Sequence, residues 1–327
     1  MCTRVVYKGP NHTIITARSM DFKMEIPPNI WILPAGMKRV SSVGTNVMEW
    51  TSRYGSVVTT SWDIAVSDGM NEKGLVANLL WLTSTNYPTY NKAAPSKALV
   101  VSFWAQYVLD HFATVLEAVT ALQAEDFVIV SDNIPGTDRF VDVHLSISDS
   151  SGDSAIFEYI NGKLTIHHDS SYVVMTNDPI YDEQLAINAY WKDIPGTVFL
   201  PGTNKAQDRF VRASYYIHAV PQTDDKRIAI ASAFSVIRNV SVPYGISIEG
   251  SPNLSTTRWR TVSDQKNLTY YFEDALSPNA IWVAFNKINL TTSGKVKKLA
   301  LDHEEIYVGE VSGQFIETEP FKFLCMK

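Results

Sequence analysis

The chain has 327 residues, 45% of them hydrophobic and 19% charged, which is typical of a packed globular protein and unlike a disordered chain. The formal net charge of −6 gives no basic footprint for the phosphate backbone of a nucleic acid. Two cysteines are too few for a disulfide framework, and no apolar run approaches the roughly 20 residues that a membrane-spanning helix needs.

The chain begins with two β-rich runs around a turn. Residues 2–7 and 13–17 flank Gly9-Pro10-Asn11, which is the local signature of an antiparallel hairpin. If the chain reverses at Pro10-Asn11, the numbers of facing residues sum to about 21. Cys2 would then face Ser19, and the hairpin would bring a cation and an anion, Arg18 and Asp21, within reach of the chain start.

Cys2 can supply both a nucleophile and a base. Met1 precedes a small residue, the usual condition for its removal, and its loss would give Cys2 a free α-amine beside its thiol. An α-amine has a reference pKa of about 7.7–8.0 against about 10.4 for lysine, so part of it is neutral near pH 7 and can move protons. Arg18 would stabilise the thiolate, and Asp21 would hold the α-ammonium. The alternative is a buried, inert Cys2 in an edge strand with Arg18 and Asp21 as a surface ion pair.

Further along the chain, strand patterns alternate with helical ones. Strands are predicted at 57–66, 75–82, 140–148, 155–160, 164–167, 172–176, 257–262, 268–273 and 281–285. Helices are predicted at 97–109 running on to 122, and at 181–191, 206–218 and 225–236. Antiparallel strand groups interleaved with helices favour an α+β fold with two sheets packed between helices. Because no linker divides the chain, we expect a single domain over residues 1–327.

Several segments resemble, in family order, the choloylglycine hydrolase and penicillin V acylase family. These segments are Cys2-Thr3-Arg4, Ala17 to Phe22, Asp68 to Leu75, Met175 to Pro179, and Leu200-Pro201-Gly202 to Arg209-Phe210-Val211. The resemblance implies an N-terminal nucleophile hydrolase with an αββα sandwich that hydrolyses linear amides. It also implies that no metal or organic cofactor is used and that the chain assembles as a homotetramer.

The resemblance assigns catalytic roles to Cys2, Arg18, Asp21, Asn177 and Arg209. Asn177 follows a predicted apolar strand and precedes Asp-Pro, so its side-chain amide would serve as an oxyanion donor. On its residues alone Asn177 reads as a turn-forming asparagine, and Arg209 as a solvated helix residue beside Asp208.

One position departs from the family pattern. Trp81 stands where bile salt hydrolases usually carry an Asn, so its side chain cannot copy an amide, although its backbone N–H could still face the oxyanion. Trp81 with Met20, Phe22 and Met24 would form an apolar, aromatic acyl pocket. The alternative is that these four are ordinary core residues.

These features predict an amidase for a small-molecule amide with an apolar or aromatic acyl group, such as penicillin V or an N-acyl homoserine lactone. Conjugated bile salts are the alternative substrates, and a noncatalytic binding protein on the same fold is the alternative function. With no signal-peptide core, the chain as written predicts a cytoplasmic protein, or a periplasmic one if Met1 replaces a leader that ended just before Cys2.

Two histidine-rich clusters, His167-His168-Asp169 and His303-Glu304-Glu305, lack a spaced partner and are predicted to lie on the surface. A papain-like pair built on Cys325 has no surrounding motif.

Overall fold

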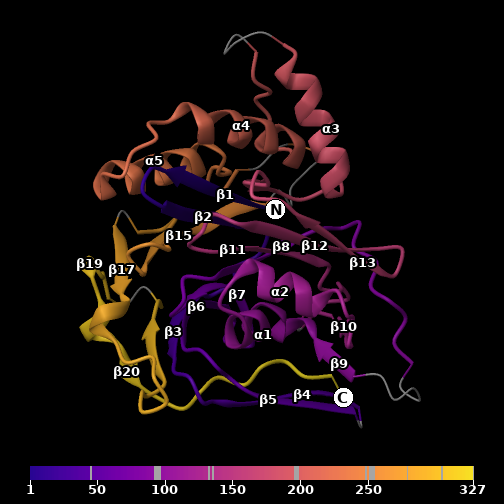
Figure 1. Ribbon diagram of the computed structural model, residues 1–327, viewed down its shortest axis with the longest axis vertical. Helices are drawn as coiled ribbons and strands as arrows, with labels where there is room; N and C mark the ends of the chain where they lie inside the picture. The colour runs from indigo at the N-terminus through magenta and orange to yellow at the C-terminus, as the bar shows by residue number, and fades with distance from the viewer. Residues whose placement is uncertain are drawn as a thin grey trace.

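The computed structural model describes residues 1–327 except 45, 92–96, 132, 135, 195–198, 247–248, 250–254, 278, 303–304 and 327. Two β-sheets lie face to face, with helices on their outer faces (Figure 1), so the predicted αββα sandwich of the α+β class is confirmed. Two apolar cores fill the layers, one around the seven-stranded sheet and one between the nine-stranded sheet and its helices. Within the described residues, none of the helices is long and apolar enough to cross a membrane.

The first sheet carries the chain start. Its strand order is β14-β1-β2-β15-β16-β17-β19. The bounds are β1 Cys2–Gly9, β2 Thr13–Phe22, β14 Val174–Met175, β15 Thr256–Asp264, β16 Thr269–Asp274, β17 Ala280–Ala284 and β19 Gly309–Glu310. Its outer face is covered by α4 Ala206–Ala219, which contacts β1, and α5 Lys226–Asn239, which contacts β1 and β2, while α3 Tyr181–Lys192 packs against α4 (Figure 1).

The second sheet has the order β13-β12-β11-β8-β7-β6-β3-β18-β20. The bounds are β3 Asn29–Leu33, β6 Ser56–Ser61, β7 Ala65–Asn71, β8 Val76–Trp81, β11 Val143–Ser148, β12 Ser154–Ile160, β13 Lys163–His168, β18 Lys297–Ala300 and β20 Ile316–Glu317. Helices α1 Trp104–His111 and α2 Val115–Leu122 pack on its outer face.

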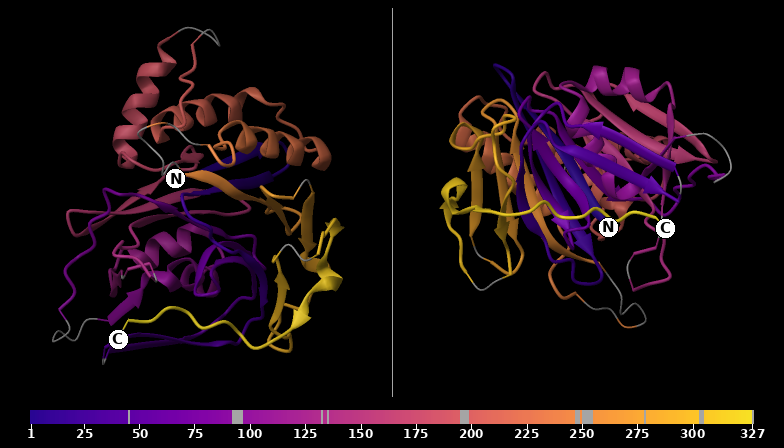
Figure 2. Two further views of the ribbon diagram at one scale, coloured as in Figure 1. Left: turned by 180° about the vertical axis from the view of Figure 1, so that it is seen from behind. Right: turned by 90° about the horizontal axis from the view of Figure 1, so that it is seen from below.

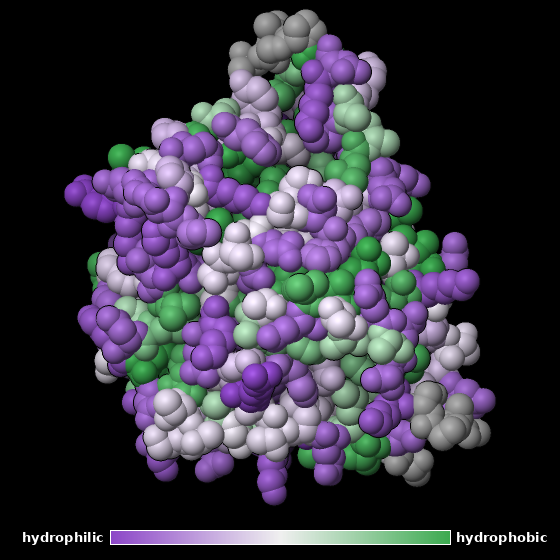
Figure 3. All heavy atoms as spheres, in the orientation of Figure 1, coloured by the Kyte–Doolittle hydropathy of each residue, from purple (hydrophilic) through white to green (hydrophobic). Residues whose placement is uncertain are grey.

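Two small sheets complete the fold, β4 Lys38–Val43 with β5 Asn46–Thr51 and β9 Lys97–Val100 with β10 Phe127–Val130. Short 3₁₀ turns lie at η1 Val101–Phe103, η3 Phe285–Lys287 and η4 Ser312–Gln314. Seen from behind and from below, the C-terminal tail runs along the β4–β5 side of the molecule (Figure 2). On the face of Figure 1, polar side chains are spread widely and apolar ones gather over the strands in the middle (Figure 3).

The N-terminal hairpin forms as predicted, but its register differs by one residue. Cys2 pairs with Met20, not with Ser19. The cause is the turn, in which Asn11 and His12 both adopt a left-handed backbone conformation, with φ of 53° and 56°. Because side chains alternate along a strand, the shift places Met20 on the same face as Cys2.

Two other predicted elements are divided in the structure. The run 57–66 is two strands, β6 and β7, because Trp62 and Asp63 turn the chain with φ of 53° and 52°. The segment predicted to be helical from residue 97 begins instead with strand β9, and α1 starts only after it. β9 pairs in parallel with β10, which follows α2 in the chain.

Candidate active site

The backbone of Cys2 is held on both sides. Met1 and Asp21 exchange two hydrogen bonds across the hairpin: the Met1 amine donates to the Asp21 carbonyl at 2.6 Å, and the Asp21 N–H donates to the Met1 carbonyl at 2.9 Å. Since alternate residues of an antiparallel pair bond across the ladder, the N–H and C=O of Cys2 point the other way. There the N–H donates to Asn177 Oδ1 at 2.7 Å, and the C=O accepts from Arg209 Nη1 at 2.6 Å.

The Cys2 side chain points between the two sheets, where a guanidinium meets it. Arg18 Nη2 lies 3.7 Å from Cys2 Sγ and donates to the Leu79 carbonyl at 3.0 Å, while Nη1 donates to Asp68 Oδ2 at 2.6 Å. Arg18 and Asp68 are both fully buried. Although burial acts to lower it, the pKa of Arg18 is raised, because the Cys2 sulfur and the Asp68 carboxylate face the guanidinium.

Asp21 and Arg209 lie on the opposite face of the hairpin from the Cys2 side chain. Asp21 is fully buried; its Oδ1 accepts from Thr257 Oγ1 at 2.6 Å, and its Oδ2 lies 3.8 Å from Arg209 Nη1. Arg209 comes from the first turn of α4 and also donates to Thr3 Oγ1 and Asn177 Oδ1, at 2.5 and 2.7 Å. Far from being a solvated helix residue, Arg209 is fully buried and ties the chain start to Asn177.

Asn177 and Trp81 lie next to Cys2 at the end of their strands. Asn177 Nδ2 donates to the Trp81 carbonyl at 2.6 Å, which leaves its second N–H free. Leu82 donates its N–H to the Asp142 carbonyl on the β11 side, so Trp81, one residue earlier, directs its own N–H away from β11. The side-chain amide of Asn177 and the backbone N–H of Trp81 are thus available as two donors near Cys2.

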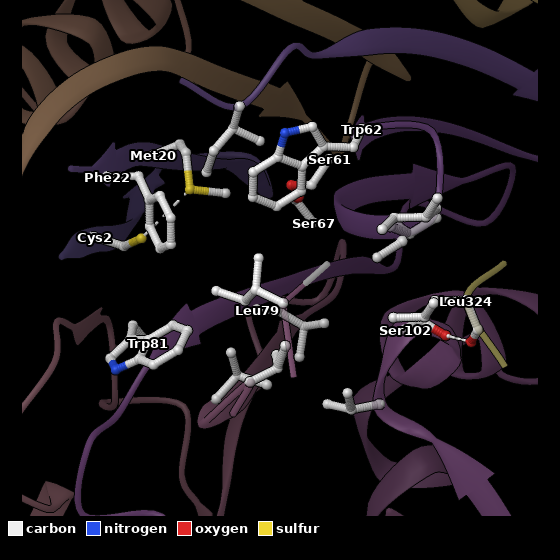
Figure 4. A pocket seen from close by; sticks show the side chains of 18 of the residues that line it. Cys2, Met20, Phe22, Ser61, Trp62, Ser67, Leu79, Trp81, Ser102 and Leu324 are labelled. Atoms are coloured by element: carbon white, nitrogen blue, oxygen red, sulfur yellow. Dashed lines mark hydrogen bonds between the residues drawn. The ribbon is translucent and has the colours of Figure 1, made fainter. Parts of the chain in front are cut away.

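A largely apolar cavity of about 120 Å³ extends from Cys2 between the sheets (Figure 4). Met20, Phe22 and Trp81 line the end next to Cys2, and the rings of Phe22 and Trp81 lie 6.1 Å apart. Leu79 lies in the middle, and the far end reaches Ser102 and Leu324, where Ser102 Oγ donates to the Leu324 carbonyl at 2.7 Å.

Met24, predicted to join this pocket, does not line it; Ile26 does. The reason is that β2 ends at Phe22, so the strand alternation that would have carried Met24 to the same face stops before it.

Behind Asn177 lies a buried ionic cluster that the sequence pattern does not reveal. His144 lies with Nδ1 3.0 Å from Glu158 Oε1 and Nε2 3.0 Å from the Thr176 carbonyl, so both ring nitrogens face acceptors. His167 Nε2 lies 3.4 Å from Glu158 Oε2, and His167 is buried, whereas a surface position was predicted; His168 and Asp169 are exposed, as predicted. The cluster supports the strand end that carries Asn177.

Within the part of the chain that the structure describes, no group of histidine, cysteine, aspartate or glutamate side chains could hold a metal ion. Of the second predicted cluster, His303 and Glu304 lie outside the described residues. Asp68 is the other neighbour of the site to which the sequence analysis gave no role, and the signal available was that it is the one charged residue of its strand.

A profile of the linear amide C–N hydrolases, choloylglycine hydrolase family, matches residues 2–299. A penicillin V acylase of Pectobacterium atrosepticum is 49% identical over 344 aligned residues, which cover 98% of this chain and 92% of that protein. The solved structure of penicillin V acylase from Agrobacterium tumefaciens is similar with a TM-score of 0.93 and 52% identity, covering 99% of this chain and 100% of the other. A conjugated bile acid hydrolase of Clostridium perfringens, 22% identical over 95% of this chain and 98% of its own, shares the fold with a TM-score of 0.79.

Proposed function

This chain belongs to the choloylglycine hydrolase family of linear amide C–N hydrolases, and on that premise we propose that it is an amidase of the penicillin V acylase type with Cys2 as its nucleophile. The observation that carries the proposal is the position of Cys2 Sγ, at the end of an apolar cavity and 3.7 Å from a buried guanidinium (Figure 4).

In the proposed reaction the Cys2 thiolate attacks the amide carbonyl. Arg18 supports the thiolate by its positive charge. The oxyanion that forms accepts hydrogen bonds from the Trp81 backbone N–H and the free N–H of Asn177 Nδ2, donors already fixed by the β8 strand and by Arg209. Water then hydrolyses the thioester and regenerates the thiol.

The leaving amine needs a proton, which we assign to the α-amine of Cys2 once Met1 has been removed. The nitrogen of Cys2 is held 2.7 Å from Asn177 Oδ1, and Arg209 donates to both Asn177 Oδ1 and the Cys2 carbonyl. Asp21, fully buried on the same side, would stabilise the ammonium form of this amine.

The cavity fits a compact apolar acyl group. Its volume of about 120 Å³ is close to that of an engineered apolar cavity of about 150 Å³ that binds benzene, so it accommodates the aromatic ring of a phenoxyacetyl group. Phe22 and Trp81 would contact the aromatic ring of such a group. The small volume of the cavity, which runs past Leu79 towards Leu324, favours a second candidate, an N-acyl homoserine lactone with a linear acyl chain, over the rigid steroid of a bile salt.

The test is release of free amine from penicillin V, medium- and long-chain N-acyl homoserine lactones, and glycine- and taurine-conjugated bile salts. Wild type is compared with Cys2→Ala and with Cys325→Ala as a matched cysteine control, and intact mass establishes that Met1 is absent. We expect turnover of penicillin V that Cys2→Ala abolishes and Cys325→Ala retains. Turnover by Cys2→Ala would contradict the nucleophile, and no turnover of the panel by Met1-free wild type would favour a noncatalytic binding protein.

A further inference from the structure

Arg139 follows β10 in the chain and lies beside Trp81, at the end of the cavity next to Cys2. Its guanidinium carbon stacks 4.0 Å from the centre of the Trp81 ring. The backbone of Arg139 is held by two hydrogen bonds: its carbonyl accepts from the Ile134 N–H at 2.8 Å and its N–H donates to Thr137 Oγ1 at 3.2 Å. Ile134 and Val141, on either side of Arg139, both line the cavity. Arg139 is therefore held beside the end of the cavity that adjoins Cys2.

The Arg139 guanidinium forms no ion pair with a described residue. Among the described residues, no carboxylate lies within ion-pair distance of its guanidinium and no hydrogen bond from its side chain is formed. The Asp142 carboxylate is near enough to be influenced by its charge, but the two do not form an ion pair. Because stacking on Trp81 uses only the flat face of the guanidinium, its N–H groups remain able to bind an anion in the plane.

Arg139 is connected to the start of the chain through its stacking partner: the Trp81 carbonyl accepts from Asn177 Nδ2, and Asn177 Oδ1 accepts from the Cys2 N–H. Burial lowers the pKa of the Met1 amine; Cys2 and Asp21 act to raise this pKa, and the positive charges of Arg209 and Arg139 act to lower it. In the proposed reaction the Cys2 amine gives its proton to the leaving amine, so the amine half of the substrate must lie beside the chain start while the acyl half occupies the cavity. Arg139, which stacks on Trp81 at the end of the cavity next to Cys2, adjoins the position of the amine half.

We propose that Arg139 is a specificity-determining residue that binds an acidic group on the amine half of the substrate. This inference rests on the proposed function and refines its substrate class: amides whose amine half is an amino acid, among them the penam nucleus of penicillin V with its carboxylate. A homoserine lactone carries no such charge, so its amides gain nothing from Arg139.

The test uses matched pairs of substrates that differ only in this charge, with the Cys2 amine free. One pair is penicillin V and its methyl ester, and the other is hexanoylglycine and hexanoylglycinamide. The value of kcat/KM is measured for wild type, Arg139→Ala, Arg139→Lys and, as a matched arginine that stacks on Tyr54 away from the cavity, Arg53→Ala.

We expect Arg139→Ala to lower kcat/KM for the two acids by about tenfold and for the two neutral partners by less than about twofold. Arg139→Lys should recover part of the preference for the acids, high salt should weaken that preference in wild type, and Arg53→Ala should change neither substrate. An equal loss on acid and neutral partner would mean that Arg139 only supports Trp81 and would overturn the inference. A wild type that prefers hexanoyl to phenoxyacetyl amides would refute the proposed acyl preference, while the hexanoyl pair would still decide the role of Arg139.

Discussion

Replacing Asp68 by asparagine is expected to cost both stability and activity. Asp68 is fully buried on β7, where Oδ2 accepts from Arg18 at 2.6 Å and Oδ1 accepts from the Tyr270 hydroxyl. Asparagine has almost the same shape, so the substitution removes the negative charge and leaves Arg18 as a buried cation without its anionic partner. Arg18 would keep its contacts with Cys2 Sγ, Met20 Sδ and the Leu79 carbonyl, none of which is a carboxylate.

The size of the stability loss follows from the burial of the pair. Removing one partner of a buried ion pair costs about 3–5 kcal/mol. We expect the lower end, about 3 kcal/mol, because asparagine can still accept from Tyr270 and because burial already raises the pKa of Asp68 despite the opposing effect of Arg18. With an unfolding entropy of about 2.1 cal/mol/K per residue, this loss lowers the Tm of a chain of this length by roughly 4 °C.

Thermal unfolding monitored by circular dichroism gives the Tm, and amine release well below it gives kcat/KM. The matched control is Asp110→Asn, since Asp110 is another buried carboxylate, 3.3 Å from Arg39 and away from the cavity. Both variants should lose a similar amount of stability, but only Asp68→Asn should lose activity, by about tenfold, because only Asp68 orients Arg18. Equal activity in the two variants, or a Tm shift under about 1 °C for Asp68→Asn, would refute this reasoning.

Three further substitutions test the other parts of the site. Arg209→Lys removes the planar fork that spans the Cys2 carbonyl and Asn177 Oδ1, so kcat should fall about thirtyfold or more with the circular dichroism spectrum unchanged; a loss under about threefold would contradict its positioning role. Although burial acts to raise it, hydrogen bonds from His144 and its neighbours hold the pKa of Glu158 at about 2. Its carboxylate therefore stabilises the fold above about pH 4.5, and this contribution is lost as the pH falls towards 2. Glu158→Gln should lower the free energy of unfolding in urea by about 3 kcal/mol at pH 7 and by progressively less below pH 4. If the difference between wild type and variant did not change with pH, the low pKa of Glu158 would not be the cause of the stabilisation. Leu79→Phe should narrow the middle of the cavity, so kcat/KM for decanoyl amides should fall by about tenfold and kcat/KM for butyryl amides should change by less than about twofold. An equal loss of kcat/KM on both amides would show that the acyl chain takes another path.

The local part of the site could be predicted from the sequence, since one hairpin carries Cys2, Arg18 and Asp21 within 20 residues. Its register could not, because the shift depends on two consecutive left-handed residues, Asn11 and His12, that are neither glycine nor proline. The same cause hid the turn that divides residues 57–66.

Partners distant in the chain were harder to predict. Asn177 and Arg209 were identified through the family resemblance, since each has an ordinary structural explanation when taken alone. Asp68 lies in a segment of the family resemblance, but its role was missed because the sequence does not indicate that it meets a guanidinium 50 residues earlier in the chain. Periodicity predicts which face a residue occupies but not which side chain on another sheet it will contact.

The division of the site between the two sheets has a consequence for how substrate preference can vary. The seven-stranded sheet and α4 hold the proposed nucleophile and its neighbours, because Arg209 contacts both Cys2 and Asp21 there. The nine-stranded sheet and its loops supply most of the wall of the cavity, including Leu79 and Trp81. Side chains on that wall can change without moving the nucleophile, so the acyl group accepted can differ between relatives that share one mechanism. The Arg18–Asp68 ion pair is an exception, because it joins the two sheets next to the Cys2 thiol. A change at Asp68, on the nine-stranded sheet, would therefore also affect the surroundings of Cys2.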